Sequence, residues 1–130
     1  MEWVFRGDLP IYSQLVEQIK LGIVSGRLLP GERLPSVRDM AAEAGVNPNT
    51  MQRALQDLER EGMVYSQRTA GRFVTEDMHV IDRAKKQFAD EQIRGFLVAM
   101  EKLGYDWEEI LTLLKEREKK KEEEENNGDS

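Results

Sequence analysis

The residues best suited to chemistry lie in a short polar stretch, Asn47-Pro48-Asn49-Thr50, at the start of an expected helix. Asparagine can pair with two positions on the edge of adenine, and threonine can hydrogen-bond to several bases. A helix start that only packed against a core would bring in an apolar side chain sooner. From spacing alone, Asn49 fits a base contact and an ordinary exposed position equally well.

Four arginines accompany this stretch and could meet the phosphates or base edges of a nucleic acid. Arg38 belongs to the first turn of the preceding helix, and Arg53 lies one turn beyond the polar tip. Arg68 and Arg72 flank an expected hairpin loop, from which arginines can follow a minor groove. The alternative for the hairpin pair is simple solubility. For Arg38 the alternative is a solvated side chain, and the neighbouring polar tip favours a groove contact.

The distribution of charge is compatible with DNA binding, although the chain has a net charge of −6. Residues 1–75 contain 9 basic and 9 acidic residues, whereas residues 76–130 contain 10 and 16. All basic residues of the first part except Lys20 are arginines. A neutral, arginine-using domain joined to an acidic one is therefore expected.

Other chemistries find little support. The chain has no cysteine and one histidine, which excludes disulfides, thiolate sites and multi-histidine metal sites within one chain. His79 stands near Asp77 and Asp82, where a solvated helix start is a simpler explanation than a cation site. No phosphate-binding loop or nucleophile–base motif occurs, so we expect neither an enzyme nor a cofactor. The absence of a long apolar run or signal peptide predicts a cytoplasmic protein.

The elements that must position these residues follow from apolar periodicity and cap residues. Residues 11–26 form a helical pattern with apolar positions every four residues. A short second helix should begin after Ser36 and end at Gly45, and a third should span residues 47–61. Residues 63–74 alternate around a glycine-containing loop, which predicts a two-stranded hairpin. Two helices, a hairpin and an exposed polar helix start predict a winged helix-turn-helix.

The C-terminal part predicts two further helices, one from about residue 78 to 103 and another that begins near residue 107. From Lys115 onwards the chain is almost wholly charged, so we expect it to fray and become disordered. The expected domains are 1–76 for DNA binding, 77–120 for dimerisation and 121–130 as a disordered charged tail. The residues expected to form the dimer interface are Phe88, Phe96, Leu97, Met100, Trp107, Ile110 and Leu114.

The stretch from Gly26 to Val74 resembles the DNA-binding domain of the GntR family of bacterial transcription regulators. The features that carry this resemblance are Gly26, Pro30-Gly31, Leu34-Pro35-Ser36, Arg38, Ala41, Gly45-Val46, Thr50, Ala54, Leu55, Leu58, Gly62 and Gly71. With the preceding helix, which starts at "PIYSQL", the resemblance covers more than half of the chain. The resemblance and the polar pattern together assign DNA contacts to Arg38, Asn47, Asn49, Thr50, Arg53, Arg68, Gly71 and Arg72.

The remaining residues are too few for the larger ligand domains or the fused aminotransferase of other members, and histidines are too few for a metal-binding bundle. "NPNT" and "LGYDWEEILTLLKE" resemble the YtrA subfamily. The short pair of C-terminal helices in this subfamily implies a homodimer. Its members also imply that the protein is a repressor, and imply only weakly that it represses a transporter operon. The better-known branch of the family has arginines at the positions of Pro48 and Gln52, so its base preference does not transfer.

The expected function is therefore a homodimeric repressor that binds an inverted-repeat operator in double-stranded DNA, with a small-molecule effector left open. The alternatives are an enzyme, which no motif in the sequence supports, and a protein-interaction module that acts through the acidic half. A gel shift against DNA upstream of the protein's own gene separates the repressor from the interaction module.

Overall fold

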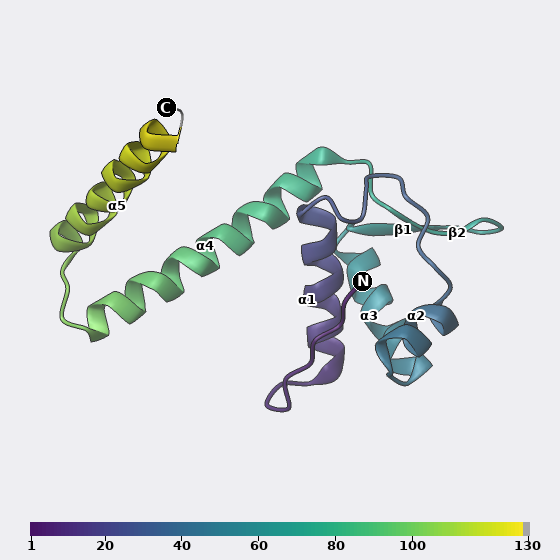
Figure 1. Ribbon diagram of the computed structural model, residues 1–130. Coiled ribbons are helices and arrows are strands. Elements are labelled where there is room, and N and C mark those ends of the chain that lie inside the picture. The colour runs from purple at the N-terminus through teal and green to yellow at the C-terminus, as the bar shows by residue number, and fades with distance from the viewer. Residues whose placement is uncertain (129–130) are drawn as a thin grey trace. The chain divides into compact units, whose positions relative to one another are not determined.

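The computed structural model describes residues 1–128, which form a mainly helical fold with one small β-hairpin (Figure 1). This confirms the predicted class of a winged helix-turn-helix followed by two C-terminal helices. The elements are α1 (Ile11–Val24), α2 (Val37–Ala44), α3 (Pro48–Arg60), β1 (Val64–Gln67), β2 (Gly71–Val74), α4 (Met78–Lys102) and α5 (Trp107–Gly128). The chain divides into two compact units, Met1–Phe88 and a second that begins at Ala89.

The core of the first unit forms where α1, α2 and the hairpin meet α3. Leu15, Ile19 and Ile23 recur every four residues along α1 and are buried, as their period predicts. The buried stripe of α3 consists of Met51, Ala54, Leu55 and Leu58. Because this stripe fixes one face of α3 against the core, the opposite face is left to solvent.

The turn between α2 and α3 uses the caps that the sequence predicted. The hydroxyl of Ser36 accepts a hydrogen bond from the Asp39 N–H at 3.1 Å and begins α2. Gly45 ends α2 with a φ of +70°, a left-handed conformation that glycine adopts without steric cost. The Asn47 side chain then accepts from the Asn49 N–H at 2.8 Å, and Pro48 occupies the first turn of α3.

The hairpin pairs Val64 with Val74 and Gln67 with Gly71, around a turn at residues 68–70. A third segment, which the sequence did not reveal, runs along its free edge. Arg33 forms a β-bridge with Phe73, and the Leu34 N–H donates to the Arg72 carbonyl at 2.9 Å. The loop before α2 is thereby attached to the wing.

The N-terminal segment lies along α1 through two glutamine side chains. The amide of Gln18 both accepts from and donates to the backbone of Val4, and that of Gln14 does the same with Arg6. The two side-chain amides thus pair with the backbone of the N-terminal segment as a neighbouring β-strand would. Trp3 packs against the core at this place. Apolar periodicity and cap residues do not predict this arrangement.

The first unit extends past residue 76, where the sequence placed a domain boundary. Ile81 and Ala84, both on α4, are buried in the core of the first unit and are 5% and 7% exposed. The reason is that the first turns of α4 carry apolar side chains at a helical spacing, which cover the core. The division falls within α4, after Phe88.

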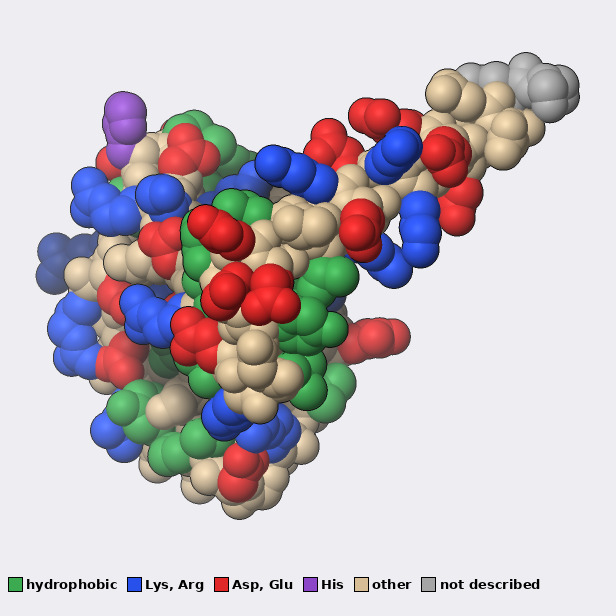
Figure 2. All heavy atoms as spheres, turned by 90° about the vertical axis from the view of Figure 1, so that its left-hand side faces the viewer, with side chains coloured by type: hydrophobic (Ala, Val, Ile, Leu, Met, Phe, Trp, Pro, Cys, Tyr) green, Lys and Arg blue, Asp and Glu red, His purple; other side chains and the backbone are tan. Residues whose placement is uncertain are grey.

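Residues 121–128 belong to the tail that the sequence predicts to be disordered, and in the structure they continue α5 to Gly128. Lysine and glutamate are strong helix formers, and pairs such as Glu116 and Lys120 stand four residues apart. Figure 2 shows acidic and basic side chains interspersed along the far end of α5. Residues 129 and 130 lie outside the described part of the chain. No helix among the described residues is long and apolar enough to cross a membrane.

The burial of Ile81 gives a first prediction. Ile81→Ala should lower the free energy of unfolding by about 2–5 kcal/mol, because it removes a side chain from a packed core. Met78→Ala, on the same helix at 51% exposure, is the matched control and should change stability by less than about 1 kcal/mol. Urea denaturation followed by circular dichroism measures both. A loss for Ile81→Ala as small as that of the control would show that the start of α4 is not part of the core.

Candidate nucleic-acid interface

The first turn of α3 is exposed and polar. Asn47, Pro48 and Asn49 are exposed, and Thr50 is half-buried. The side-chain Oδ1 of Asn47 accepts the cap bond from the Asn49 N–H, whereas no such bond holds the Asn49 side chain among the described contacts. Asn47 therefore shapes the tip, and the Asn49 amide and Thr50 hydroxyl are groups of the kind that hydrogen-bond to base edges.

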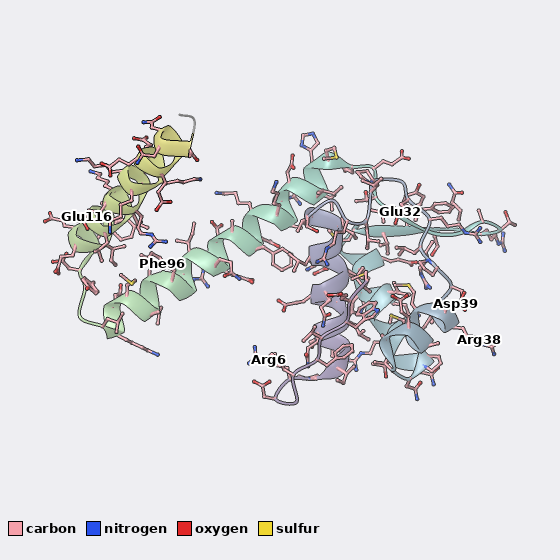
Figure 3. All side chains as sticks on the ribbon, in the orientation of Figure 1. Arg6, Glu32, Arg38, Asp39, Phe96 and Glu116 are labelled. Carbon is pink, nitrogen blue, oxygen red and sulfur yellow. The ribbon has the colours of Figure 1, made fainter. Side chains whose placement is uncertain are left out.

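Arg38 lies on α2, the helix that precedes this tip. It is exposed at the start of that helix, one residue after Val37. Figure 3 shows its side chain extending outward from α2. A guanidinium in this position can reach a base edge or a phosphate.

Arg53 has a partner that the sequence analysis missed. Its guanidinium carbon lies 3.8 Å from the centre of the Tyr12 ring, which is a cation–π contact between α3 and α1. Stacking leaves the in-plane N–H groups available to other acceptors. The contact with Tyr12 therefore limits the conformations of the Arg53 side chain and leaves its N–H groups available to donate hydrogen bonds.

Arg72 is tied to the end of α3 through Glu59. The Arg72 Nε donates to a Glu59 carboxylate oxygen at 2.7 Å, and the hydroxyl of Ser66 donates to that oxygen too. Ser66 and Arg72 are paired across the hairpin, so one carboxylate connects both strands to α3. The bond from Ser66 and the bonded, positive Arg72 lower the pKa of the Glu59 carboxyl below its ordinary value of 4.5.

Arg68 and Gly71 complete the tip of the wing. Arg68 is exposed in the turn of the hairpin. Gly71 has a φ of +105°, and a β-carbon there would lie 3.3 Å from the Nε of Arg33. The positive φ and the close approach of the Arg33 side chain both favour glycine at this position. The wing thus has an exposed arginine in its turn, and a second one, Arg72, whose ion pair with Glu59 holds the hairpin on α3.

The residues expected to form a dimer interface differ in exposure. Phe96, Trp107 and Leu114 are 40%, 59% and 48% exposed. Ile110 is only 2% exposed within the single chain. The Ile110 side chain thus packs within its own chain, as an apolar residue near a capped helix start does, and its part in an interface stays a prediction. Phe88, Leu97 and Met100 are half-buried.

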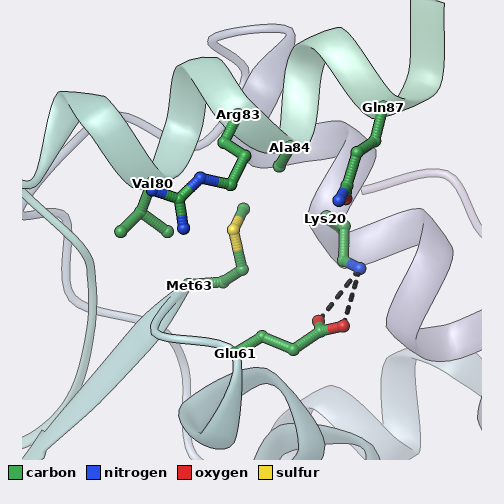
Figure 4. A pocket seen from close by; sticks show the side chains of 7 residues that line it. All are labelled: Lys20, Glu61, Met63, Val80, Arg83, Ala84 and Gln87. Carbon is green, nitrogen blue, oxygen red and sulfur yellow. Dashed lines mark hydrogen bonds and ion pairs between the residues drawn. The ribbon is translucent and has the colours of Figure 1, made fainter. Parts of the chain in front are cut away.

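A small pocket of about 190 Å³ lies between α1, the end of α3 and the start of α4 (Figure 4). The Lys20 ammonium pairs with the Glu61 carboxylate at 2.9 Å on one side of it. Arg83 adds a second cation, and Met63 and Val80 supply apolar surface. Within residues 1–128, no group of three or more potential metal-binding side chains gathers.

The comparison with known families decides what this arrangement is. Residues 11–74 match the model of the bacterial regulatory proteins of the gntR family. The chain is 41% identical over 115 residues to the HTH-type transcriptional regulator YhcF of Bacillus subtilis. The aligned region covers 88% of this chain and 95% of YhcF. The chain belongs to the GntR family. Since that family comprises DNA-binding regulators, the expectation that the chain is not an enzyme is confirmed.

The subfamily is supported by a second relative. The HTH-type transcriptional repressor YtrA of Bacillus subtilis is 32% identical over 112 residues, 85% of this chain and 86% of that one. A GntR-family regulator from Listeria monocytogenes has a similar structure, with a TM-score of 0.78 and 37% sequence identity. The alignment covers 86% of this chain and 98% of the Listeria protein. The DNA-binding domain of AraR, solved in complex with an operator, is 32% identical and aligns with a TM-score of 0.53. The alignment covers 58% of this chain and 96% of the AraR domain.

The position of Glu59 predicts a pH-dependent stability. Because its folded-state pKa is lowered, Glu59 contributes stability that is fully present above its unfolded pKa and is lost as pH falls through the folded-state value. Glu59→Gln should therefore lower the melting temperature at about pH 7, and the difference from wild type should shrink towards about pH 3. The exposed Glu17→Gln on α1 is the control. A difference between wild type and Glu59→Gln that stays constant over this range would contradict the assignment.

Proposed function

We propose that this GntR-family regulator is a repressor that binds an inverted-repeat operator as a homodimer. The observation that carries the proposal is the exposed polar start of α3, which offers Asn49 and Thr50 on a helix whose opposite face is buried. A helix held in this way can enter the major groove with its first turn at the base edges. The AraR domain, solved in complex with an operator, supports the DNA-binding part of the proposal.

Within this proposal the side chains divide into two classes. Asn49 and Thr50 read bases, and Arg38 contacts a base edge or a phosphate within the groove. Arg53, held on Tyr12, contacts a phosphate, as does Arg68 in the wing. Asn47 and Gly71 shape the backbone that approaches the DNA. The charge balance of the first unit is compatible with this division, because arginines supply most of its positive charge.

The homodimer follows from apolar surface on the C-terminal helices. Phe96 on α4, Leu103 in the turn after α4 and Trp107 on α5 are 40%, 72% and 59% exposed in the single chain. Exposed large apolar side chains that lie near one another in the chain are a feature of partner sites. A second copy is the simplest partner, because two-fold homodimers are the commonest oligomers. Two recognition helices related by such an axis would meet half-sites about one helical turn apart.

The likeness to YtrA, named a transcriptional repressor, is the support for repression rather than activation. We extend the proposal to a transporter operon as the regulated target, on the sequence resemblance to this subfamily. A small-molecule effector of unassigned identity would complete the regulation. The site of action is chromosomal DNA, in the bacterial cytoplasm. The genes that neighbour the coding sequence would test the target and suggest the effector.

The recognition tip gives the most direct mutational prediction. Asn49→Ala should weaken binding to the specific operator by about 1–3 kcal/mol, because a bidentate contact to a base is lost, and it should leave binding to random DNA little changed. The control is Asn126→Ala, which removes the same side chain from the exposed far end of α5. Fluorescence anisotropy measures both affinities. An unchanged specific affinity with an unchanged melting temperature would contradict the base-reading role of Asn49.

The proposed dimer predicts the effect of a charge on the apolar face of α4. Phe96→Glu should convert the dimer into a monomer at micromolar concentration, because a charge cannot be buried there without a partner. Val98→Glu is the matched control: Val98 is 44% exposed and lies on the opposite side of the same helix, two residues on. Analytical ultracentrifugation decides. A wild-type chain that is monomeric at this concentration, yet binds the operator at full strength, would rule the dimer out.

A further inference from the structure

The segment that precedes α2 is joined to the wing by backbone hydrogen bonds. Arg33 forms a β-bridge with Phe73, and on either side the Leu34 N–H donates to the Arg72 carbonyl and the Val74 N–H to the Glu32 carbonyl. These bonds, of 2.9 and 2.8 Å, fix Arg33 beside the second strand of the hairpin. Arg33 is therefore attached to the wing, although it lies far from it in sequence.

The side chain of Arg33 lies against the end of the wing turn. A β-carbon at Gly71 would stand 3.3 Å from its Nε and 3.6 Å from its Nη2. The guanidinium thus covers the one residue of β2 that has no side chain. Between this segment and the wing is an open cleft of about 440 Å³.

The charge of the cleft is positive. Arg33 and Arg68, both exposed, line it, whereas Arg72 is engaged with Glu59. Within the part of the chain that the structure describes, no carboxylate lines this cleft. The hydroxyls of Ser36 and Thr69 add neutral hydrogen-bonding groups. A phosphodiester group matches such a lining, because its anionic oxygens accept charge-assisted bonds from guanidinium donors.

We propose that Arg33 is a phosphate-binding residue of the DNA interface, which forms with Arg68 a cleft for the DNA backbone between the wing and the loop before α2. Arg72 holds the wing on α3 and takes no direct part. The assignment rests on the proposed DNA-binding function and adds a contact that the sequence did not suggest. In sequence Arg33 belongs to a turn, and only its pairing with β2 brings it to the wing.

The test measures the affinity of the full chain for its operator and for random duplex DNA as a function of salt concentration. Arg33→Ala should lower both affinities to a similar extent, roughly tenfold at low salt, since a charge-assisted phosphate contact is lost without a base contact. The slope of log affinity against log salt should become shallower by about one. Arg33→Gln, which keeps most of the side-chain volume, should give the same slope and guards against a packing effect.

Two further variants isolate the role of Arg33. Arg27→Ala, an exposed arginine elsewhere in the first unit, should leave the slope unchanged. Arg72→Ala should lower the melting temperature, and this loss should disappear in a Glu59→Gln background, because the two residues form one ion pair. Arg33 variants that retain the wild-type slope, in a chain that binds its operator, would overturn the Arg33 assignment alone. A wild-type chain that binds neither DNA would overturn the proposed function and the assignment with it.

Discussion

The burial of one face of α3 is the constraint on which the rest of the structure depends. Met51 and Leu58 are fully buried at either end of this face, against α1 and the hairpin. A helix fixed on one side can turn its other side to a partner without losing stability. The polar first turn is therefore held rigidly, although it contributes little to the core. Rigid presentation matters because a base contact depends on the position of short side chains.

The second connection is electrostatic and lies one residue beyond the buried stripe. Glu59 receives bonds from Ser66 and Arg72, so the end of the recognition helix holds both strands of the wing. The hairpin alone would be marginally stable. Tied to α3 and extended by the segment around Arg33, it becomes part of the same rigid unit. The proposed base-reading tip and the proposed phosphate contacts are thereby held in a fixed geometry.

The local features were predictable because they depend on local sequence. Ser36 and Asn47 cap their helices as expected, and the glycine at position 45 ends α2. Contacts between distant segments were not predictable from periodicity. The stacking of Arg53 on Tyr12 and the ion pair of Arg72 assign roles that side-chain type alone does not distinguish. Ile110 shows the same limit: an apolar residue on a helix face can be buried by its own chain or by a second one, and here its own chain covers it.

The central claim is that the first turn of α3 reads bases in two symmetry-related half-sites. Selection of the full chain on a random library of DNA duplexes, followed by sequencing of the bound fraction, tests it most directly. We expect an inverted repeat whose half-site centres lie about one helical turn apart. The same selection with Asn49→Ala should lose preference at matching positions of both half-sites. Enrichment of no motif, or of a single asymmetric site that Asn49→Ala selects equally well, would contradict the account.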